Sequence, residues 1–119
     1  MRFDYPSVGA TENVLLAAVA ARGTTVIEGA ALEPEIETLC LFLKELGADI
    51  AGTGAHTPTE SGSIPLHDAS CAMPGDRIVA GTYLGAVMSA GGEVLLSGAP
   101  VRHMESTLKL AKHMGAKLK

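Results

Sequence analysis

The sequence predicts a mixed α/β (α+β) fold built from repeated strand–helix units. Short segments rich in β-branched residues alternate with longer segments of helical periodicity. Glycines separate these segments, and the same order of elements occurs twice in 119 residues. We therefore expect a duplicated β-α-β-α-β unit whose copies need neighbours to cover their apolar faces.

The first copy is readable element by element. Residues 11–22 predict a helix whose apolar residues surround most of the helical wheel, which is typical of a buried helix. The β-branched residues 24–28 predict a strand. A second helix is expected to begin at residues 33–35, where a proline and two acids suit the first turn, and to end at Gly47. A further strand is expected over residues 49–51.

The second copy follows a less regular stretch. Residues 52–74 contain several glycine and proline breaks, including Pro58, and predict one or two short strands joined by turns. Beyond them, a helix is expected over residues 77–90, then a strand over residues 93–97 and an amphipathic helix over residues 104–114.

Matching sequences support the duplication. Residues 26–27 align with residues 95–96, and residues 46–48 align with residues 114–116 at nearly the same offset. The second copy reaches Lys119 before its last strands are formed. We therefore expect one complete unit and one partial unit, in a chain that is a piece of a longer protein.

Composition and charge exclude several classes of function. Hydrophobic residues make up 47% of the chain and charged residues 18%, as expected of a folded domain. The formal charge is −4 and the cations are scattered, which argues against nucleic acid and anionic membranes as partners. The longest apolar run covers eight residues, far below the roughly 20 that span a bilayer. Two cysteines without a CxxC pattern fit a reduced, cytoplasmic location.

Three groups of residues could carry chemistry. Ser7, Val8 and Gly9 precede the first helix, where free backbone N–H groups suit a phosphate, although on spacing alone an ordinary helix cap is the better explanation. Glu33 and Glu35 are explained as partners of a helix dipole. Arg77 is either solvated or able to clamp a phosphate or carboxylate.

Metal binding and cysteine chemistry are not expected. The histidines lack the spacing of zinc ligands. Cys40 belongs to the apolar face of the second helix and is interpreted as a core thiol, while Cys71 falls in an expected strand with no nearby base.

Five segments in order resemble one enzyme family. They are DYPSVGATEN (residues 4–13), GTTVIEGAA (23–31), EPEI (33–36), LGA (46–48) and DRIxAGT (76–82), in which x is Val79. Together they resemble the UDP-N-acetylglucosamine 1-carboxyvinyltransferases of the enolpyruvyl transferase family. Three residues depart from the family pattern. Gly75 stands between the proline and aspartate that are adjacent in the family, Val79 replaces an acid, and Tyr5 stands where some members have a basic residue.

The resemblance implies a fold and a reaction. Family members have two domains, each of three β-α-β-α-β-β units, around an active-site cleft. Residues 1–74 would be the last unit of the first domain, and residues 75–119 the opening, incomplete unit of the second. The enzyme transfers enolpyruvyl from phosphoenolpyruvate to the 3′-hydroxyl of UDP-N-acetylglucosamine, the first committed step of peptidoglycan synthesis, without a metal or organic cofactor.

The resemblance also assigns roles to residues. Ser7, Val8 and Gly9 would bind the uridine diphosphate, and Glu33, Glu35 and Arg77 would face the cleft. The catalytic cysteine and the phosphoenolpyruvate-binding residues lie outside the matched stretch, so this chain is expected to be inactive alone. Alternatives are a non-catalytic UDP-sugar-binding module and a structural repeat unit. Because the second unit is incomplete, self-association is also expected.

Overall fold

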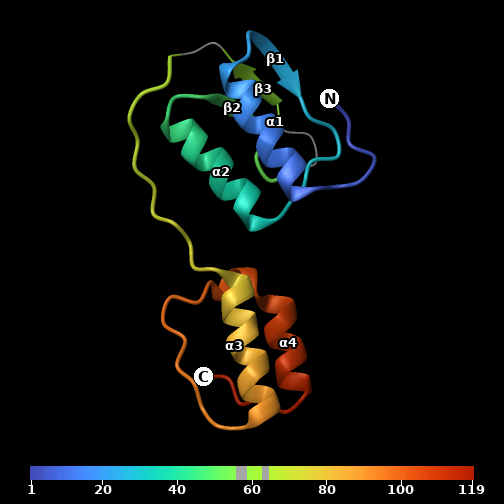
Figure 1. The fold of residues 1–119 in the computed structure, drawn as a ribbon, viewed down its shortest axis with the longest axis vertical. Helices are drawn as coiled ribbons and strands as arrows, with labels where there is room; N and C mark the ends of the chain where they lie inside the picture. Colours follow the sequence, from blue (N-terminus) through green and yellow to red (C-terminus); the bar gives the residue numbers. More distant parts are fainter. Residues whose placement is uncertain (56–58, 63–64) are drawn as a thin grey trace. The chain divides into compact units, whose positions relative to one another are not determined.

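The computed structural model describes residues 1–55, 59–62 and 65–119, with residues 59–62 described by their backbone. The chain divides into two compact units, Met1–Ala72 and Met73–Lys119. In Figure 1 the first unit runs from blue to yellow-green and the second from yellow to red. No helix in the described ranges is long and apolar enough to cross a membrane.

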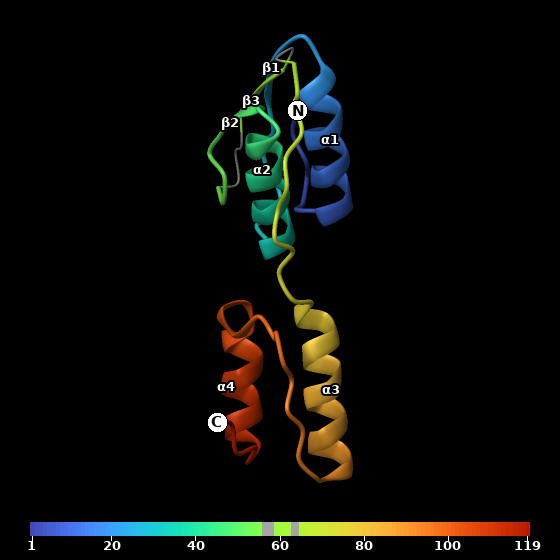
Figure 2. The same ribbon diagram turned by 90° about the vertical axis from the view of Figure 1, so that its left-hand side faces the viewer.

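The first unit combines two helices with a small antiparallel sheet. Helices α1 (Val8–Ala20) and α2 (Pro34–Glu45) lie side by side, and both begin at the same end of the unit (Figures 1 and 2). The sheet has the order β1-β3-β2, in which β3 (Thr59–Gly62) pairs with β1 (Gly23–Val26) on one side and β2 (Asp49–Ala51) on the other. The strand β3 is one of the short strands expected between residues 52 and 74, whereas Pro58 lies outside the described residues.

The first residues of the chain run beside the end of β1. Arg2 forms a parallel bridge with Glu28. The Phe3 N–H donates to the Glu28 carbonyl at 2.9 Å, and the Glu28 N–H donates to the Met1 carbonyl at 2.7 Å. Gly29 follows with a φ of 75°, and a Cβ there would lie 2.8 Å from the Phe3 carbonyl oxygen. This close backbone approach holds the segment that leads from the sheet to α2.

The core of the first unit lies between the helices and the sheet. Leu15 of α1 and Ile27 are fully buried, and Leu43 of α2 and Ile50 of β2 join the same cluster. Cys40 is 1% exposed in this cluster, which confirms its interpretation as a core thiol. Helical spacing along α2 brings its apolar residues to one side, as the periodicity predicted.

The second unit is a pair of helices. Helices α3 (Arg77–Ala90) and α4 (Glu105–His113) lie side by side, and a short 3-10 helix, η1 (Val101–His103), precedes α4 (Figures 1 and 2). The Asp76 carboxylate accepts from the N–H groups of Ile78 and Val79 at 2.7 and 3.0 Å. Asp76 is therefore the expected cap of α3, whose bounds agree with the prediction.

Three predictions for individual elements were wrong. The strand over residues 93–97 is not formed, and Leu95 is 90% exposed. The second unit is described completely and contains no other strand, so this segment has no partner for its backbone groups. Cys71 likewise lies in an exposed, irregular segment. Helix α1 begins at Val8, earlier than residue 11, because Ser7 already acts as its cap.

Candidate functional site

The start of α1 combines a serine cap with an exposed glycine. Ser7 is the N-cap residue in an extended conformation, and its hydroxyl accepts from the Ala10 N–H at 3.4 Å, a long hydrogen bond. The Ser7 carbonyl accepts from the Thr11 N–H at 2.9 Å. Val8 is half-buried and packs against the core, which anchors the first turn, whereas Gly9 is exposed.

The space outside Gly9 is open. Apart from its own helical turn, a Cβ built on Gly9 would meet no atom within 4 Å, so no other described residue covers this side of the first turn. The first N–H groups of a helix have no partner inside the helix, and the helix dipole places partial positive charge there. The first turn of α1 also contains no acidic residue. This arrangement can receive an anion such as a phosphate or diphosphate.

The two acids predicted for the site lie at the start of α2. Glu33 is the N-cap residue of α2 but makes no capping hydrogen bond with its side chain. Glu35 lies in the first turn, where it interacts favourably with the helix dipole. Glu33 is half-buried and Glu35 is exposed. Because α1 and α2 begin at the same end of the unit, the structure brings Ser7, Val8, Gly9 and both acids to one end (Figures 1 and 2).

Thr11 connects these two helix starts, and the sequence analysis missed it. Its hydroxyl donates to the Ser7 carbonyl at 2.8 Å and accepts from the Ala31 N–H at 3.0 Å. Thr11 is fully buried. The spacing of four residues between Ser7 and Thr11 was the available signal, since a helical threonine can donate to the carbonyl four residues earlier. The contact with Ala31 had no signal in the sequence.

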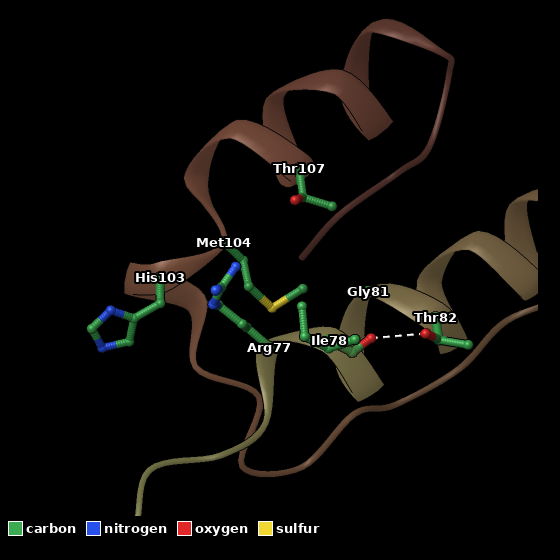
Figure 3. Close-up of a pocket in the computed structure, with 7 residues that line it drawn as sticks. All are labelled: Arg77, Ile78, Gly81, Thr82, His103, Met104 and Thr107. Atoms are coloured by element: carbon green, nitrogen blue, oxygen red, sulfur yellow. Dashed lines mark hydrogen bonds between the residues drawn. The ribbon is translucent and has the colours of Figure 1, made fainter. Parts of the chain in front are cut away.

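Arg77 belongs to the second unit, where it begins α3. It lines a shallow pocket of about 300 Å³ between the starts of α3 and α4, together with His103, Met104 and Thr107. Figure 3 shows the Arg77 side chain extending toward Met104, whereas the His103 ring points away from the other side chains. The Thr82 hydroxyl in the same pocket donates to the Ile78 carbonyl at 2.8 Å.

The pocket therefore contains the guanidinium group of Arg77, whose side chain extends toward the apolar side chain of Met104. Such a group can pair with a carboxylate or phosphate. Among the described residues, histidine, cysteine and acidic side chains form no group of three or more that could hold a metal ion.

Comparison with known proteins gives a match along the full chain. The family model described as EPSP synthase (3-phosphoshikimate 1-carboxyvinyltransferase) matches residues 1–119. The chain is 47% identical over 119 residues to UDP-N-acetylglucosamine 1-carboxyvinyltransferase 2 of Caldanaerobacter subterraneus subsp. tengcongensis, covering 100% of this chain and 28% of that protein.

Two further relatives carry the corresponding name. The UDP-N-acetylglucosamine 1-carboxyvinyltransferase of Corynebacterium efficiens is 45% identical over 115 residues, which is 97% of this chain and 27% of the relative. That of Sphingopyxis alaskensis is 48% identical over 117 residues, again 97% of this chain and 27% of the relative. The chain thus spans little more than a quarter of the length of these relatives.

Proposed function

Because the whole chain belongs to the EPSP synthase (3-phosphoshikimate 1-carboxyvinyltransferase) family, we propose that it is part of a UDP-N-acetylglucosamine 1-carboxyvinyltransferase. Such an enzyme transfers the enolpyruvyl group of phosphoenolpyruvate to the 3′-hydroxyl of UDP-N-acetylglucosamine and releases phosphate. This is the first committed step of peptidoglycan synthesis, and its location is the cytoplasm. The observation that carries the proposal is an identity of 45–48% over nearly all of the chain with three relatives of this name.

Within this function, we assign the uridine diphosphate to the start of α1. The open side of Gly9 allows the phosphates to approach the backbone, and the N–H groups of the first turn are the donors. The hydroxyl of Ser7 lies beside them and can supply a further hydrogen bond, since its bond to Ala10 is long. Val8 fixes the turn by packing into the core.

Glu33 and Glu35 would serve a different part of the substrate. A carboxylate repels a diphosphate but accepts hydrogen bonds from hydroxyl and amide groups. We therefore assign these two acids to the sugar side of the cleft, where they bind directly or set its charge. Arg77, in the second unit, would pair with an anionic group of a substrate.

We further propose that residues 1–74 are the last repeat unit of the first domain and residues 75–119 the opening of the second. Matched backbone conformations support the repeat. Gly29 and Gly98, which align in the two copies, have φ values of 75° and 77°. Gly47 and Gly115 have φ values of 102° and 98°. Gly47 and Gly115 each follow a helix of their copy, whereas Gly29 follows the strand β1 and Gly98 follows an irregular segment.

No residue of this chain is assigned a catalytic role. We place the reactive groups and the phosphoenolpyruvate site in the rest of the enzyme; this chain spans 28% of the first relative's length. The reaction as proposed uses no metal or organic cofactor. The contribution of this chain is to bind and orient UDP-N-acetylglucosamine. These contacts hold the reacting hydroxyl in the correct geometry.

The proposal is tested by nuclear magnetic resonance titration of the 119-residue chain. We expect UDP-N-acetylglucosamine and UDP to shift the amide signals of residues 7–13, with a dissociation constant in the millimolar range, about −4 kcal/mol. UMP and N-acetylglucosamine, which lack the diphosphate, serve as controls and should shift these signals far less. If none of the four compounds shifts them at high millimolar concentration, the helix start is only a cap. A micromolar dissociation constant would instead favour a self-sufficient UDP-sugar-binding module.

A further inference from the structure

Among the described residues of the first unit, Thr11 is the one buried polar residue. Its exposed fraction is 0%, and it lies one helical turn below Ser7 on α1. Buried hydroxyl groups are nearly always hydrogen-bonded, since an unsatisfied one is costly. A valine would fill the same volume without that requirement. A threonine at this position therefore indicates that the hydroxyl itself is needed.

The hydroxyl of Thr11 is used in both of its roles. A hydroxyl has one proton to donate and lone pairs to accept. The proton goes to the Ser7 carbonyl at 2.8 Å, and the oxygen accepts from the Ala31 N–H at 3.0 Å. Ala31 is 1% exposed, so its N–H has no access to water and needs an acceptor from the protein. Thr11 thus joins two backbone segments that are 20 residues apart in the sequence.

Each of these two segments leads directly to a proposed ligand-binding group. The Ser7 carbonyl lies at the start of α1, beside Val8 and Gly9. Ala31 lies two residues before Glu33, the first residue of the α2 start. Both starts lie at the same end of the unit (Figures 1 and 2). A shift of Ala31 away from Thr11 would therefore change the position of the acids relative to the phosphate-binding turn.

We propose that Thr11 is a positioning residue for UDP-sugar binding, which holds the phosphate-binding turn of α1 at a fixed position relative to Glu33 and Glu35. This inference rests on the function proposed above. Thr11 is fully buried and acts through the backbone of Ser7 and Ala31, not by contact with the substrate. The hydroxyl thereby makes the binding of the diphosphate depend on the geometry of the α2 start.

The test compares two substitutions of Thr11 in the 119-residue chain. Thr11→Ser keeps the hydroxyl, whereas Thr11→Val keeps the volume and removes it. With UDP-N-acetylglucosamine as the probe, we expect Thr11→Ser to bind within about twofold of the wild type and Thr11→Val at least about tenfold more weakly. The matched control is Ile50→Val, a core substitution in β2 of the same unit, which should lower the urea midpoint while the affinity stays unchanged.

A second measurement uses the unmodified chain and does not depend on the folding of a variant. Saturating UDP-N-acetylglucosamine should slow hydrogen exchange at the Ala31 amide, although this amide is buried away from the ligand. Two outcomes would overturn the positioning role and leave the proposed function standing. One is wild-type affinity in Thr11→Val, and the other is unchanged hydrogen exchange at Ala31 when the wild type is saturated with ligand. If the wild type binds no UDP-N-acetylglucosamine, both the proposed function of this site and the positioning role of Thr11 are refuted.

Discussion

Substitutions of Gly9 separate a ligand site from an ordinary helix cap, because they act on folding and on binding in opposite directions. Gly9 is exposed in the first turn of α1, and a Cβ there would meet no atom of the chain within 4 Å. Gly9→Ala therefore creates no clash, and it should stabilise the fold by up to about 0.5–1 kcal/mol because alanine loses less conformational freedom in a helix. Gly9→Val should be no less stable than the wild type, since valine also exceeds glycine in helix propensity.

Binding should change in the other direction. A side chain at Gly9 occupies the open side of the turn, where the phosphates would approach the backbone N–H groups. Loss of one hydrogen bond to a charged group costs about 1.5–3 kcal/mol, which corresponds to about 10–100-fold in affinity. Against a millimolar dissociation constant, Gly9→Val should abolish measurable binding and Gly9→Ala should reduce it strongly.

The assay pairs urea unfolding with amide shifts in a UDP-N-acetylglucosamine titration. The control is Gly85→Ala, at an exposed position of α3 where a Cβ also meets no atom within 4 Å. This control should gain stability and leave the shifts of residues 7–13 unchanged. Equal shifts in the wild type and in both Gly9 variants would show that the start of α1 binds no diphosphate.

Three further predictions concern the chain as a whole. With phosphoenolpyruvate and UDP-N-acetylglucosamine present, phosphate release by the 119-residue chain should stay at background in a colorimetric assay, because the proposed reaction uses groups from both sides of a cleft. Turnover that depends on both substrates would contradict this. The chain should self-associate, because large apolar side chains of the second unit are exposed: Leu95 is 90% exposed and Met114 is 69% exposed. Light scattering that shows only monomer from micromolar to millimolar concentration would contradict this. Gly75→Ala should destabilise the second unit by about 1–3 kcal/mol in thermal unfolding followed by circular dichroism, because its Cβ would overlap the Gly98 carbonyl oxygen. An unchanged midpoint would show that the loop relaxes freely.

The helices could be predicted where their signals are local. Helix α3 has the expected bounds because Asp76 caps its first N–H groups and Gly91, with a φ of 77°, ends it. The start of α2 was correct for a similar reason, since Pro34 suits only the first turn of a helix. Caps and breakers act within one or two turns, so they can be read without knowledge of the fold.

The strands and the link through Thr11 depend on distant residues. Residues 93–97 have the composition of a strand, but a strand forms only when its backbone groups find a partner, and the second unit has none. The Thr11 hydroxyl bonds to Ala31, 20 residues away, and nothing in either local sequence indicates this pair. The sequence therefore indicated the individual groups at the site, and the structure was needed to show how the two helix starts are joined.

The four α-helices in the described part of the chain differ in how their positive ends are balanced, and this difference favours α1 as the proposed anion site. Helix α2 has Glu35 in its first turn, and α4 has Glu105. Helix α3 has no acid in its first turn, but the Asp76 carboxylate accepts two of its N–H groups. Helix α1 has only the neutral hydroxyl of Ser7, at 3.4 Å, and an exposed glycine beside it. The N-terminal turn of α1 thus has no negative charge supplied by its own cap or first turn, and a diphosphate would supply it.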